Sequence, residues 1–244
     1  MERGSLSGRV VVVTGTSQGI GAGIAAAIVE AGASVVGVSR RPIAPRGLGA
    51  GSFLAVEADV TSDGGPETAL TRALDRFGRV DALVNNAGIH RSAPCWEQPD
   101  EDFDAMFDVN VTAPFRFSQR FAQHWVHNQQ RAVILNVCSV ESDIGWLDPP
   151  QAVYAATKGA LLGLTRALAL DLSRHGIRCV AVGPGAIDTG MSEDDRSETE
   201  ARIPLDHRYG SPGEIGDVAV FLLSDAARYI TGEILYVDGG YRLP

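Results

Sequence analysis

The sequence predicts an α/β fold, with a single domain built on a doubly wound parallel sheet of seven strands. Short apolar runs alternate with longer helical patterns from one end of the 244-residue chain to the other. Several of the short runs are apolar on both alternating faces, which is typical of strands that helices cover on both sides. No linker-like shift in composition interrupts the alternation. We therefore expect successive β-α-β units and one domain over residues 1–244.

Seven apolar runs are the expected strands. They are Val10–Thr14, Ser34–Ser39, Phe53–Asp59, Ala82–Asn86, Ala132–Ser139, Arg178–Pro184 and Ile234–Asp238. Helical patterns separate them, at Ile20–Ala31, Glu67–Phe77, Asp102–His127, Ala152–Arg174 and Ile215–Leu223. Two loops stand out: 41–51, rich in proline and glycine, and the polar, acidic segment 188–204. The second is long enough to form a lid over a substrate.

Composition excludes several classes of protein. The chain has 21 basic and 30 acidic residues and a net charge of -9, without the basic stripe that nucleic-acid binding needs. Its apolar runs fall far short of the roughly 20 residues that cross a bilayer, and its N-terminus lacks a hydrophobic signal core. Three widely spaced cysteines indicate a reducing compartment rather than a disulfide framework. We expect a cytoplasmic protein without nucleic-acid or membrane partners.

A glycine-rich turn follows the first strand. Gly15, Gly19 and Gly21 lie between Thr14 and an alanine-rich helix. Glycines allow a sharp turn and the close approach of a pyrophosphate, whose charge is met by free N–H groups at the helix start. The alternative is a tight strand-to-helix turn without a ligand. The position directly after a strand and before a helix favours a dinucleotide site.

Other strand ends would meet the same ligand. Asp59 closes the third strand and the Asn85–Gly88 segment the fourth, although each could instead be a helix cap or a turn. The second strand ends with Ser39, Arg40 and Arg41, where a dinucleotide site reads the adenosine ribose. An acidic residue there would accept hydrogen bonds from both ribose hydroxyls, whereas an arginine would pair with a 2′-phosphate. The sequence therefore favours NADP(H) over NAD(H), unless both arginines are merely solvated.

A tyrosine and a lysine four residues apart indicate a reacting centre. Tyr154 and Lys158 share one face of a helix, and an ammonium beside a phenol favours the phenolate. The pair could exchange a proton with a carbonyl or hydroxyl oxygen, or be an ordinary amphipathic pair. Lys158 is the only lysine in the chain, which suggests a need for a compact, rotatable charge. Ser139 at the fifth strand end could bond a substrate oxygen, and Asn110 could hold a water or kink its helix.

These motifs together resemble the classical short-chain dehydrogenases/reductases. The chain follows that family's pattern over essentially its whole length, from TGTSQGIG through NNAG, Asn110, Ser139 and YAATK to PGAIDT and YITGEILYVDGGY. The resemblance implies a single-domain Rossmann fold, a nicotinamide cofactor and a small-molecule carbonyl or alcohol substrate. It also implies a homotetramer (or homodimer) built on the helices around 111–123 and 155–172, and no catalytic metal.

The resemblance also assigns roles to residues. Tyr154 would be the acid/base, Lys158 would lower its pKa and hold the nicotinamide ribose, Ser139 would orient the substrate oxygen, and Asn110 would support a water. The positions around the pyrophosphate would be Gly15, Ser17, Gly19, Ile20 and Gly21. On the adenosine side would lie Ser39, Arg40, Asp59, Val60, Asn86, Ala87 and Gly88. At the nicotinamide end would lie Pro184, Gly185, Ile187 and Thr189.

The chain departs from the family near its serine. Cys138-Ser139 replaces the family's usual pair of serines, and Ser139 precedes Tyr154 by 15 positions where about a dozen is usual. Ser142, at 12 positions, is therefore a rival, although Asn136–Ser139 matches the family's strand-end pattern. We expect Ser139→Ala to remove most turnover and Ser142→Ala to leave it.

The expected activity is hydride transfer between NADP(H) and a ketone or secondary alcohol, in the direction of carbonyl reduction of a 3-oxoacyl or cyclic ketone type. The first alternative is an NAD-dependent dehydrogenase of a sugar, polyol or other secondary alcohol, which cofactor preference would distinguish. The second is a dinucleotide-sensing or scaffold protein without turnover, which the presence of Asn110, Ser139, Tyr154 and Lys158 disfavours. His124 and His127 have no acidic or cysteine partner at ligand spacing, so no metal site is expected.

Overall fold

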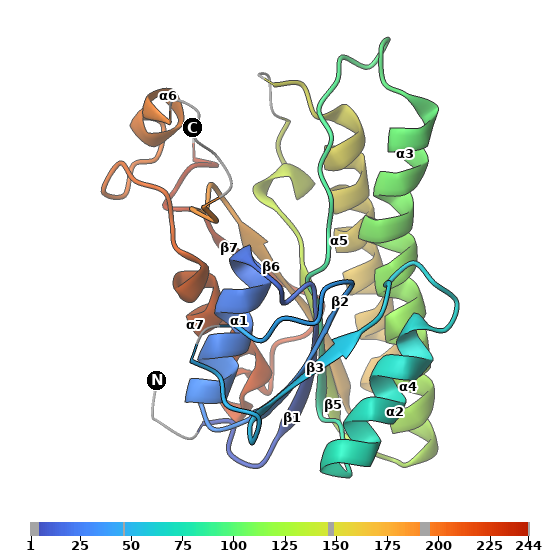
Figure 1. Ribbon diagram of the computed structural model, residues 1–244. Coiled ribbons are helices and arrows are strands. Elements are labelled where there is room, and N and C mark those ends of the chain that lie inside the picture. Colours follow the sequence, from blue (N-terminus) through green and yellow to red (C-terminus); the bar gives the residue numbers. More distant parts are fainter. Residues whose placement is uncertain (1–4, 46, 146–148, 191–195, 244) are drawn as a thin grey trace.

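A computed structural model of the chain describes residues 5–45, 47–145, 149–190 and 196–243 (Figure 1). Its centre is a seven-stranded sheet in which all strands run parallel, in the order β3-β2-β1-β4-β5-β6-β7. The strands are β1 (Val10–Thr14), β2 (Ser34–Ser39), β3 (Phe53–Glu57), β4 (Ala82–Asn85), β5 (Ala132–Val137), β6 (Ile177–Pro184) and β7 (Ile234–Val237). The predicted doubly wound sheet is confirmed.

The strand order reverses at β1. This strand pairs with β2 on one side, where Val12 lies opposite Val36, and with β4 on the other, where Val12 lies opposite Leu83. In sheets of this type the loops that leave the two halves diverge at such a point, and ligands bind above the carboxyl ends of the strands. This topology places the predicted ligand site between β1 and β4.

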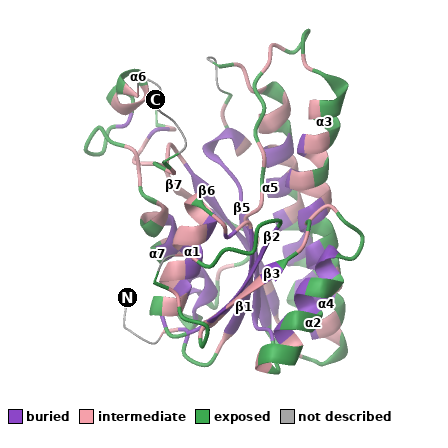
Figure 2. Cartoon of the chain, viewed as in Figure 1, coloured by how far each residue is buried: buried purple, intermediate pink, exposed green. Residues whose placement is uncertain are grey.

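Helices cover both faces of the sheet (Figure 1). One face packs against α1 (Gly19–Glu30) and α7 (Pro212–Leu223), and the other against α2 (Gly65–Phe77), α4 (Ala113–His127) and α5 (Ala152–Ser173). Val11 and Val13 of β1 join the first core, whereas Val10 and Val12 join the second. Strands buried on both faces in this way read as the unbroken apolar runs of the sequence. Figure 2 shows the buried residues concentrated along the strands and the inner sides of the helices.

The second core holds the largest buried side chain. Trp125 of α4 is fully buried, stands edge-on to Phe121 and donates a hydrogen bond from its indole nitrogen to the Val80 carbonyl at 2.8 Å. This contact ties α4 to the segment that enters β4. It thereby fixes the height of the α4 helix relative to the carboxyl edge of the sheet.

The prediction of one continuous helix over Asp102–His127 is wrong, because a π-helical turn interrupts it. The structure has α3 (Asp100–Phe107), a five-residue π-helical turn η1 (Asp108–Thr112) and α4. The expected strands over Phe53–Asp59 and Ala132–Ser139 each end two residues earlier, because Asp59 and Ser139 turn away from the ladder to bond local backbone groups. Within the expected lid, α6 (Ser197–Ala201) forms, while residues 191–195 lie outside the described part of the chain.

Among the described residues, no helix is both long enough and apolar enough to cross a membrane.

Candidate active site

The glycine turn joins β1 to α1 at the carboxyl edge of the sheet. Gly15 and Gly19 have φ angles of +74° and +57°, in the left-handed region that favours glycine. A Cβ on Gly21 would lie 2.2 Å from the Gly15 carbonyl oxygen, so only glycine fits there. The first turn of α1 contains no acidic residue that would compete with a bound anion. The turn can therefore bring backbone N–H groups close to a pyrophosphate.

Asn86, the residue after β4, supports this turn. Its side-chain nitrogen donates to the carbonyls of Thr14 at 2.8 Å and of Gly15 at 3.2 Å. The Thr14 hydroxyl accepts from the backbone N–H groups of Asn86 and Ala87, both at 3.0 Å. Asn86, which we expected on the adenosine side of the cofactor, therefore holds the glycine turn in place through its side-chain amide.

The turn also contains an unsatisfied polar atom. The Thr16 hydroxyl is buried and has no hydrogen-bond partner among the described residues. Thr189, which begins the lid, approaches from above, because a Cβ on Gly19 would lie 3.3 Å from its methyl group. The glycine turn with Thr189 beside it fits a site for the phosphates of a dinucleotide, whereas the Thr16 hydroxyl lies against β2, 2.5 Å from where a Cβ on Gly37 would be.

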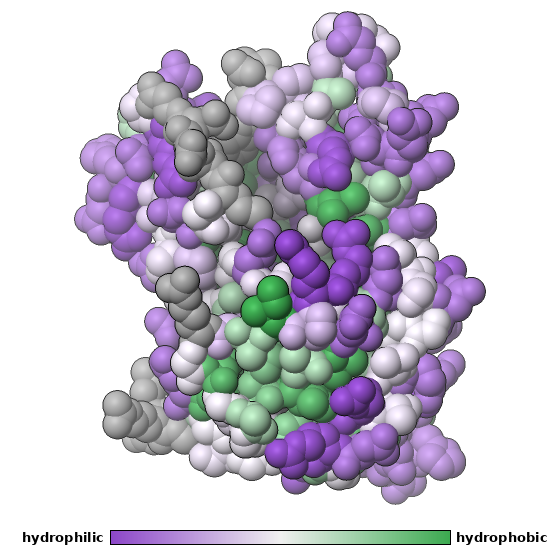
Figure 3. Space-filling model, viewed as in Figure 1, coloured by the Kyte–Doolittle hydropathy of each residue, from purple (hydrophilic) through white to green (hydrophobic). Residues whose placement is uncertain are grey.

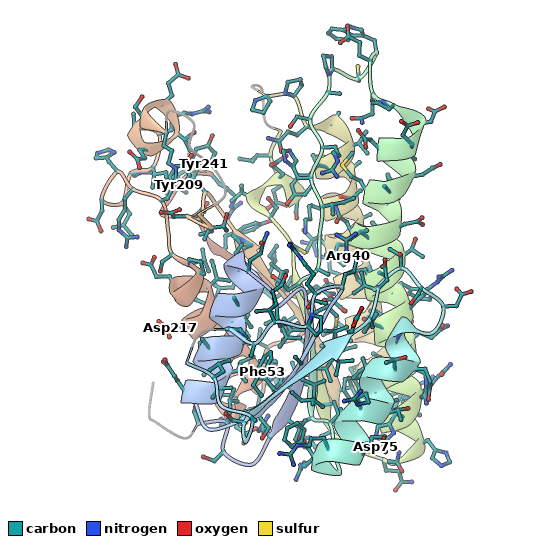
Figure 4. All side chains as sticks on the ribbon, viewed as in Figure 1. Arg40, Phe53, Asp75, Tyr209, Asp217 and Tyr241 are labelled. Carbon is teal, nitrogen blue, oxygen red and sulfur yellow. The ribbon has the colours of Figure 1, made fainter. Side chains whose placement is uncertain are left out.

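The end of β2 is basic. Arg40 is exposed at the carboxyl end of this strand (Figure 4), and hydrophilic side chains gather at the same place on the surface (Figure 3). Its charge helps to lower the pKa of Asp59, although the main cause is the hydrogen bonds that Asp59 accepts from Thr61. The Ser39 hydroxyl donates to the Arg41 carbonyl at 2.6 Å. Ser39 is buried, whereas Arg40 and Arg41 are both exposed, so arginine side chains are what this strand end presents to a ligand.

The π-helical turn η1 places Asn110 inside the site. Its side chain is buried, accepts from the Ile89 N–H at 2.9 Å, and donates to the Ile89 carbonyl at 2.9 Å and the Thr157 hydroxyl at 3.1 Å. The wide turn thus ties the loop after β4 to helix α5. Single π-turns are frequent at functional sites. Of the two roles expected for Asn110, the structure shows the distortion of the helix.

Helix α5 brings Lys158 beneath Tyr154. Lys158 is buried, and its Nζ donates to the Val137 carbonyl at the end of β5 at 2.9 Å. The same Nζ lies 5.5 Å from the centre of the Tyr154 ring. Asn110 is close as well, because a Cβ on Gly88 would lie 3.3 Å from the Asn110 side-chain oxygen and 3.7 Å from Lys158 Nζ. The structure therefore brings Asn110 and Lys158 together at Gly88, with the Tyr154 ring beside Lys158.

The pKa of Tyr154 is raised, which is opposite to the direction expected from Lys158 alone. Burial is the main cause, and the charge of Glu141 adds to it, while an interaction with the Ser139 side chain lowers the pKa. Burial also lowers the pKa of Lys158. In this state the phenol is protonated at neutral pH. The arrangement therefore suits donation of the Tyr154 proton to a substrate oxygen, as carbonyl reduction requires.

The two rival serines differ in position. The Ser139 hydroxyl accepts from the Glu141 N–H at 3.2 Å and interacts with the Tyr154 phenol. The Ser142 hydroxyl instead donates to the Lys158 carbonyl at 3.1 Å, on the backbone of α5. Ser139 therefore faces the reacting group, and Ser142 braces the turn against the helix. The loop that absorbs the extra length includes residues 146–148, which lie outside the described part of the chain.

Three polar residues that the sequence did not assign to the site lie beside Tyr154. Glu141 is buried in the η2 turn (Val140–Ser142), and His90 stands edge-on to the Tyr154 ring with 5.0 Å between ring centres. In the orientation that satisfies the Gln151 amide, its nitrogen reaches His90 Nε2 at 2.7 Å and both Glu141 carboxylate oxygens at 3.0 and 3.2 Å. Burial raises the pKa of Glu141 to about 7 and lowers that of His90.

The expected nicotinamide end lies where β6 ends. Gly185 donates to the Val237 carbonyl at 3.0 Å, and a Cβ there would lie 2.8 Å from Asp238. Ile187 forms a bridge with Gly210, which fixes the start of the lid against the segment before α7. Val60, expected near the adenine, is partly exposed above β3, on the other half of the sheet. The expected cofactor positions thus lie along the carboxyl edge of the sheet from β3 to β6.

Comparisons with known proteins agree with this geometry. A family model described as enoyl-(acyl carrier protein) reductase matches residues 15–242. A 3β-hydroxysteroid dehydrogenase of Eggerthella lenta is 36% identical over 98% of this chain and 95% of its own length. A 3-oxoacyl-(acyl-carrier-protein) reductase of Vibrio cholerae is 36% identical over 97% and 98%, respectively.

Solved structures give the same result. A short-chain dehydrogenase/reductase from Mycobacterium marinum has a TM-score of 0.92 and 34% identity, over 98% of this chain and 97% of its own. A gluconate 5-dehydrogenase from Burkholderia cenocepacia in complex with NADP and tartrate scores 0.89 at 33% identity, over 98% and 97%. A 3-ketoacyl-(acyl-carrier-protein) reductase from Brucella melitensis complexed with NADH scores 0.89 at 35% identity, over 98% and 100%.

The glycine turn, the Tyr154–Lys158 pair and the parallel sheet thus occur in a chain that matches these enzymes over nearly its full length. The chain belongs to the classical short-chain dehydrogenase/reductase family and is an NAD(P)-dependent oxidoreductase acting on CH–OH or C=O groups.

Proposed function

We propose that the protein reduces ketones to secondary alcohols with NADPH, as one domain over residues 1–244 with a lid at about 188–204. The observation that carries the proposal is the position of Tyr154 on α5, with its ring centre 5.5 Å from Lys158 Nζ and its phenol beside the Ser139 side chain. A ketone whose oxygen accepts hydrogen bonds from the Ser139 and Tyr154 hydroxyls would have its carbonyl carbon above the end of β5. The remaining catalytic residues support this one proton donor.

The chain's own residues bind, orient and move the proton. Gly15, Gly19 and Gly21 admit the pyrophosphate, and Arg40 pairs with a 2′-phosphate. Ser139 orients the ketone oxygen, and Tyr154 gives that oxygen its phenolic proton while the carbon receives a hydride. Lys158 lies behind the phenol, so its ammonium stabilises the phenolate that remains until a proton from solvent restores it. When bound, the nicotinamide supplies the hydride.

Arg40 carries the preference for NADPH. The segment 40–51 after β2 contains no acidic residue, so no carboxylate there can accept hydrogen bonds from the ribose hydroxyls. The Ser39 hydroxyl is already bonded to the Arg41 carbonyl. Related structures contain NADP in one case and NADH in another, so the choice depends on residues of this kind. We expect NADPH to bind at least tenfold more tightly than NADH, which corresponds to about 1.4 kcal/mol.

The test is a side-by-side titration of both cofactors in one buffer and salt. Arg40→Ser should remove most of the NADPH preference and leave NADH affinity within about twofold, while the neighbouring Arg41→Ser should keep the preference. Equal affinities in the wild type would contradict the proposal. They would favour the alternative, an NAD-dependent dehydrogenase of a sugar, polyol or other alcohol.

Ser139 is the proposed catalytic serine. Its side chain interacts with Tyr154, whereas the Ser142 hydroxyl is bonded to the Lys158 carbonyl. Ser139→Ala should lower kcat by about 10²-fold or more, the scale on which one donor to a reacting oxygen acts. Ser142→Ala should change kcat only a few-fold. The reverse result would transfer the role to Ser142.

We further propose a cytoplasmic homotetramer that contacts its copies through α4 and α5. Phe115 of α4 is 43% exposed and Leu170 of α5 is 80% exposed, so each helix offers an apolar side chain to a partner. Light scattering of the purified protein should give four times the monomer mass. A monomer in solution would refute this assembly without affecting the site.

A further inference from the structure

The cluster of Glu141, Gln151 and His90 lies at the reacting end of the site and has no part in the proton transfer described above. Glu141 follows β5, Gln151 directly precedes α5, and His90 lies on the loop after β4. Each residue thus comes from a loop at the carboxyl edge of the sheet. Two independent effects place the cluster at the phenol: the His90 ring contacts the Tyr154 ring, and the Glu141 charge acts on the Tyr154 hydroxyl.

The hydrogen bonds of the cluster leave acceptors open. In the orientation that satisfies the Gln151 amide, its nitrogen lies within hydrogen-bond distance of His90 Nε2 and of both Glu141 carboxylate oxygens, and its two hydrogens can serve both side chains. A carboxylate has about four acceptor positions, and this one nitrogen occupies at most two of them. Glu141 is only 8% exposed, so little of the residue is in contact with bulk water. A buried carboxyl with open acceptor positions is satisfied best by a hydrogen-bond donor on the ligand.

The charges around Glu141 decide between ligands. The cation that acts on it is Lys158, which is already bonded to the Val137 carbonyl, and no arginine in the described part of the chain acts on the carboxyl. A ligand carboxylate placed here would therefore meet a second carboxyl without a compensating cation. A ligand hydroxyl would instead donate to one of the open oxygens.

On this basis we propose that Glu141 recognises a hydroxyl group on the carbon next to the one that reacts at Tyr154. The site then selects α-hydroxy ketones and vicinal diols over plain ketones and alcohols, and it rejects substrates with a carboxylate at that position. Gln151 is a positioning residue that holds the carboxyl toward the ligand. The proposal rests on the proposed function for the reacting position and adds the substrate class.

Binding to the NADPH complex tests the recognition without turnover, because the reduced cofactor cannot oxidise an alcohol. The probes are trans-cyclohexane-1,2-diol and cyclohexanol, titrated calorimetrically. We expect the diol to bind the wild type at least fivefold more tightly. Glu141→Leu should bring the two affinities within twofold of each other. Glu141→Gln, which keeps the size and one acceptor oxygen, should give an intermediate ratio and guards against a variant that fails to fold.

Asp143→Asn is the matched control. It removes a carboxylate from the same loop, but Asp143 is exposed and pairs with Arg242 at 3.2 Å, so the wild-type ratio should remain. A diol that binds the wild type no better than cyclohexanol, or fails to bind at all, overturns the proposal. A preference for the diol that survives in Glu141→Leu overturns it as well.

Turnover separates this proposal from the proposed function. NADPH oxidation is followed with cyclohexanone, 2-hydroxycyclohexanone and 2-oxocyclohexanecarboxylate. We expect the wild type to have its highest kcat/KM with the hydroxy ketone. In Glu141→Gln, the kcat/KM for the carboxylate should rise relative to that for the hydroxy ketone. Selective binding of the diol without reduction of any ketone would refute the reductase and leave the role of Glu141 in place. Reduction of all three ketones with kcat/KM ratios that do not change in the Glu141 variants would support the reductase and refute the role of Glu141.

Discussion

Replacing Gly21 by alanine tests the glycine turn at its tightest contact. The new Cβ would lie 2.2 Å from the Gly15 oxygen and 2.3 Å from the Asn86 side-chain nitrogen, more than an ångström short of ordinary contact. Those two atoms hold the turn, because Asn86 donates to the Gly15 carbonyl. Overpacking of this kind costs roughly 1–3 kcal/mol. If the cost falls on the shape of the turn, NADPH affinity drops by about 5- to 150-fold.

Helix propensity acts in the other direction, since alanine is favoured over glycine inside a helix by about 1 kcal/mol. A loss of affinity therefore cannot come from a weaker α1. The assay is a fluorescence titration of NADPH with the variant, accompanied by a thermal melt. Gly49→Ala is the control, because a Cβ at Gly49 would meet nothing within 4 Å. NADPH affinity of Gly21→Ala within twofold of wild type would refute the account of the turn.

Two further predictions concern stability. The pKa of Glu141 rises from its ordinary 4.5 to about 7 on folding, so between these pH values the folded state binds more protons and the free energy of unfolding falls as pH rises. In denaturant titrations, the free energy of unfolding of Glu141→Gln should rise relative to that of the wild type from pH 4.5 to 7. A difference between the two that does not change with pH would contradict the burial of the charge. Ser211 and Glu214 form a capping box at the start of α7, so Ser211→Ala should cost about 0.5–2 kcal/mol. Each kcal/mol lowers the Tm of a chain this size by about 2–4 °C, and an unchanged melt would contradict the role of the cap.

The sheet could be predicted because its residues carry local patterns. β1 and β2 have the bounds that the apolar runs indicate, since valine-rich runs buried on both faces are unambiguous. The sequence could not predict that the helix around Asn110 contains a π-helical turn. The sequence shows an asparagine of poor helix propensity, but the π-turn arises from its bonds to Ile89 and Thr157, which are distant in the chain.

The site was predictable only where a motif names the residues. Tyr154 and Lys158 are four apart on one helix, and their proximity follows from helical geometry. The direction of the Tyr154 pKa shift does not, because it depends on burial and on Glu141 from another loop. Glu141, Gln151 and His90 have no common spacing, so the fold alone brings them together. The one signal in the sequence was an acidic residue just beyond a buried strand.

The central claim is that Tyr154 donates the proton in an NADPH-dependent ketone reduction. Its most direct test compares wild type and Tyr154→Phe in NADPH oxidation with 2-hydroxycyclohexanone, together with NADPH affinity. The account predicts that kcat falls by about 10²–10⁴-fold, the usual contribution of a general acid, while NADPH affinity stays within about threefold. A Tyr154→Phe variant that keeps more than a tenth of the wild-type kcat would contradict it.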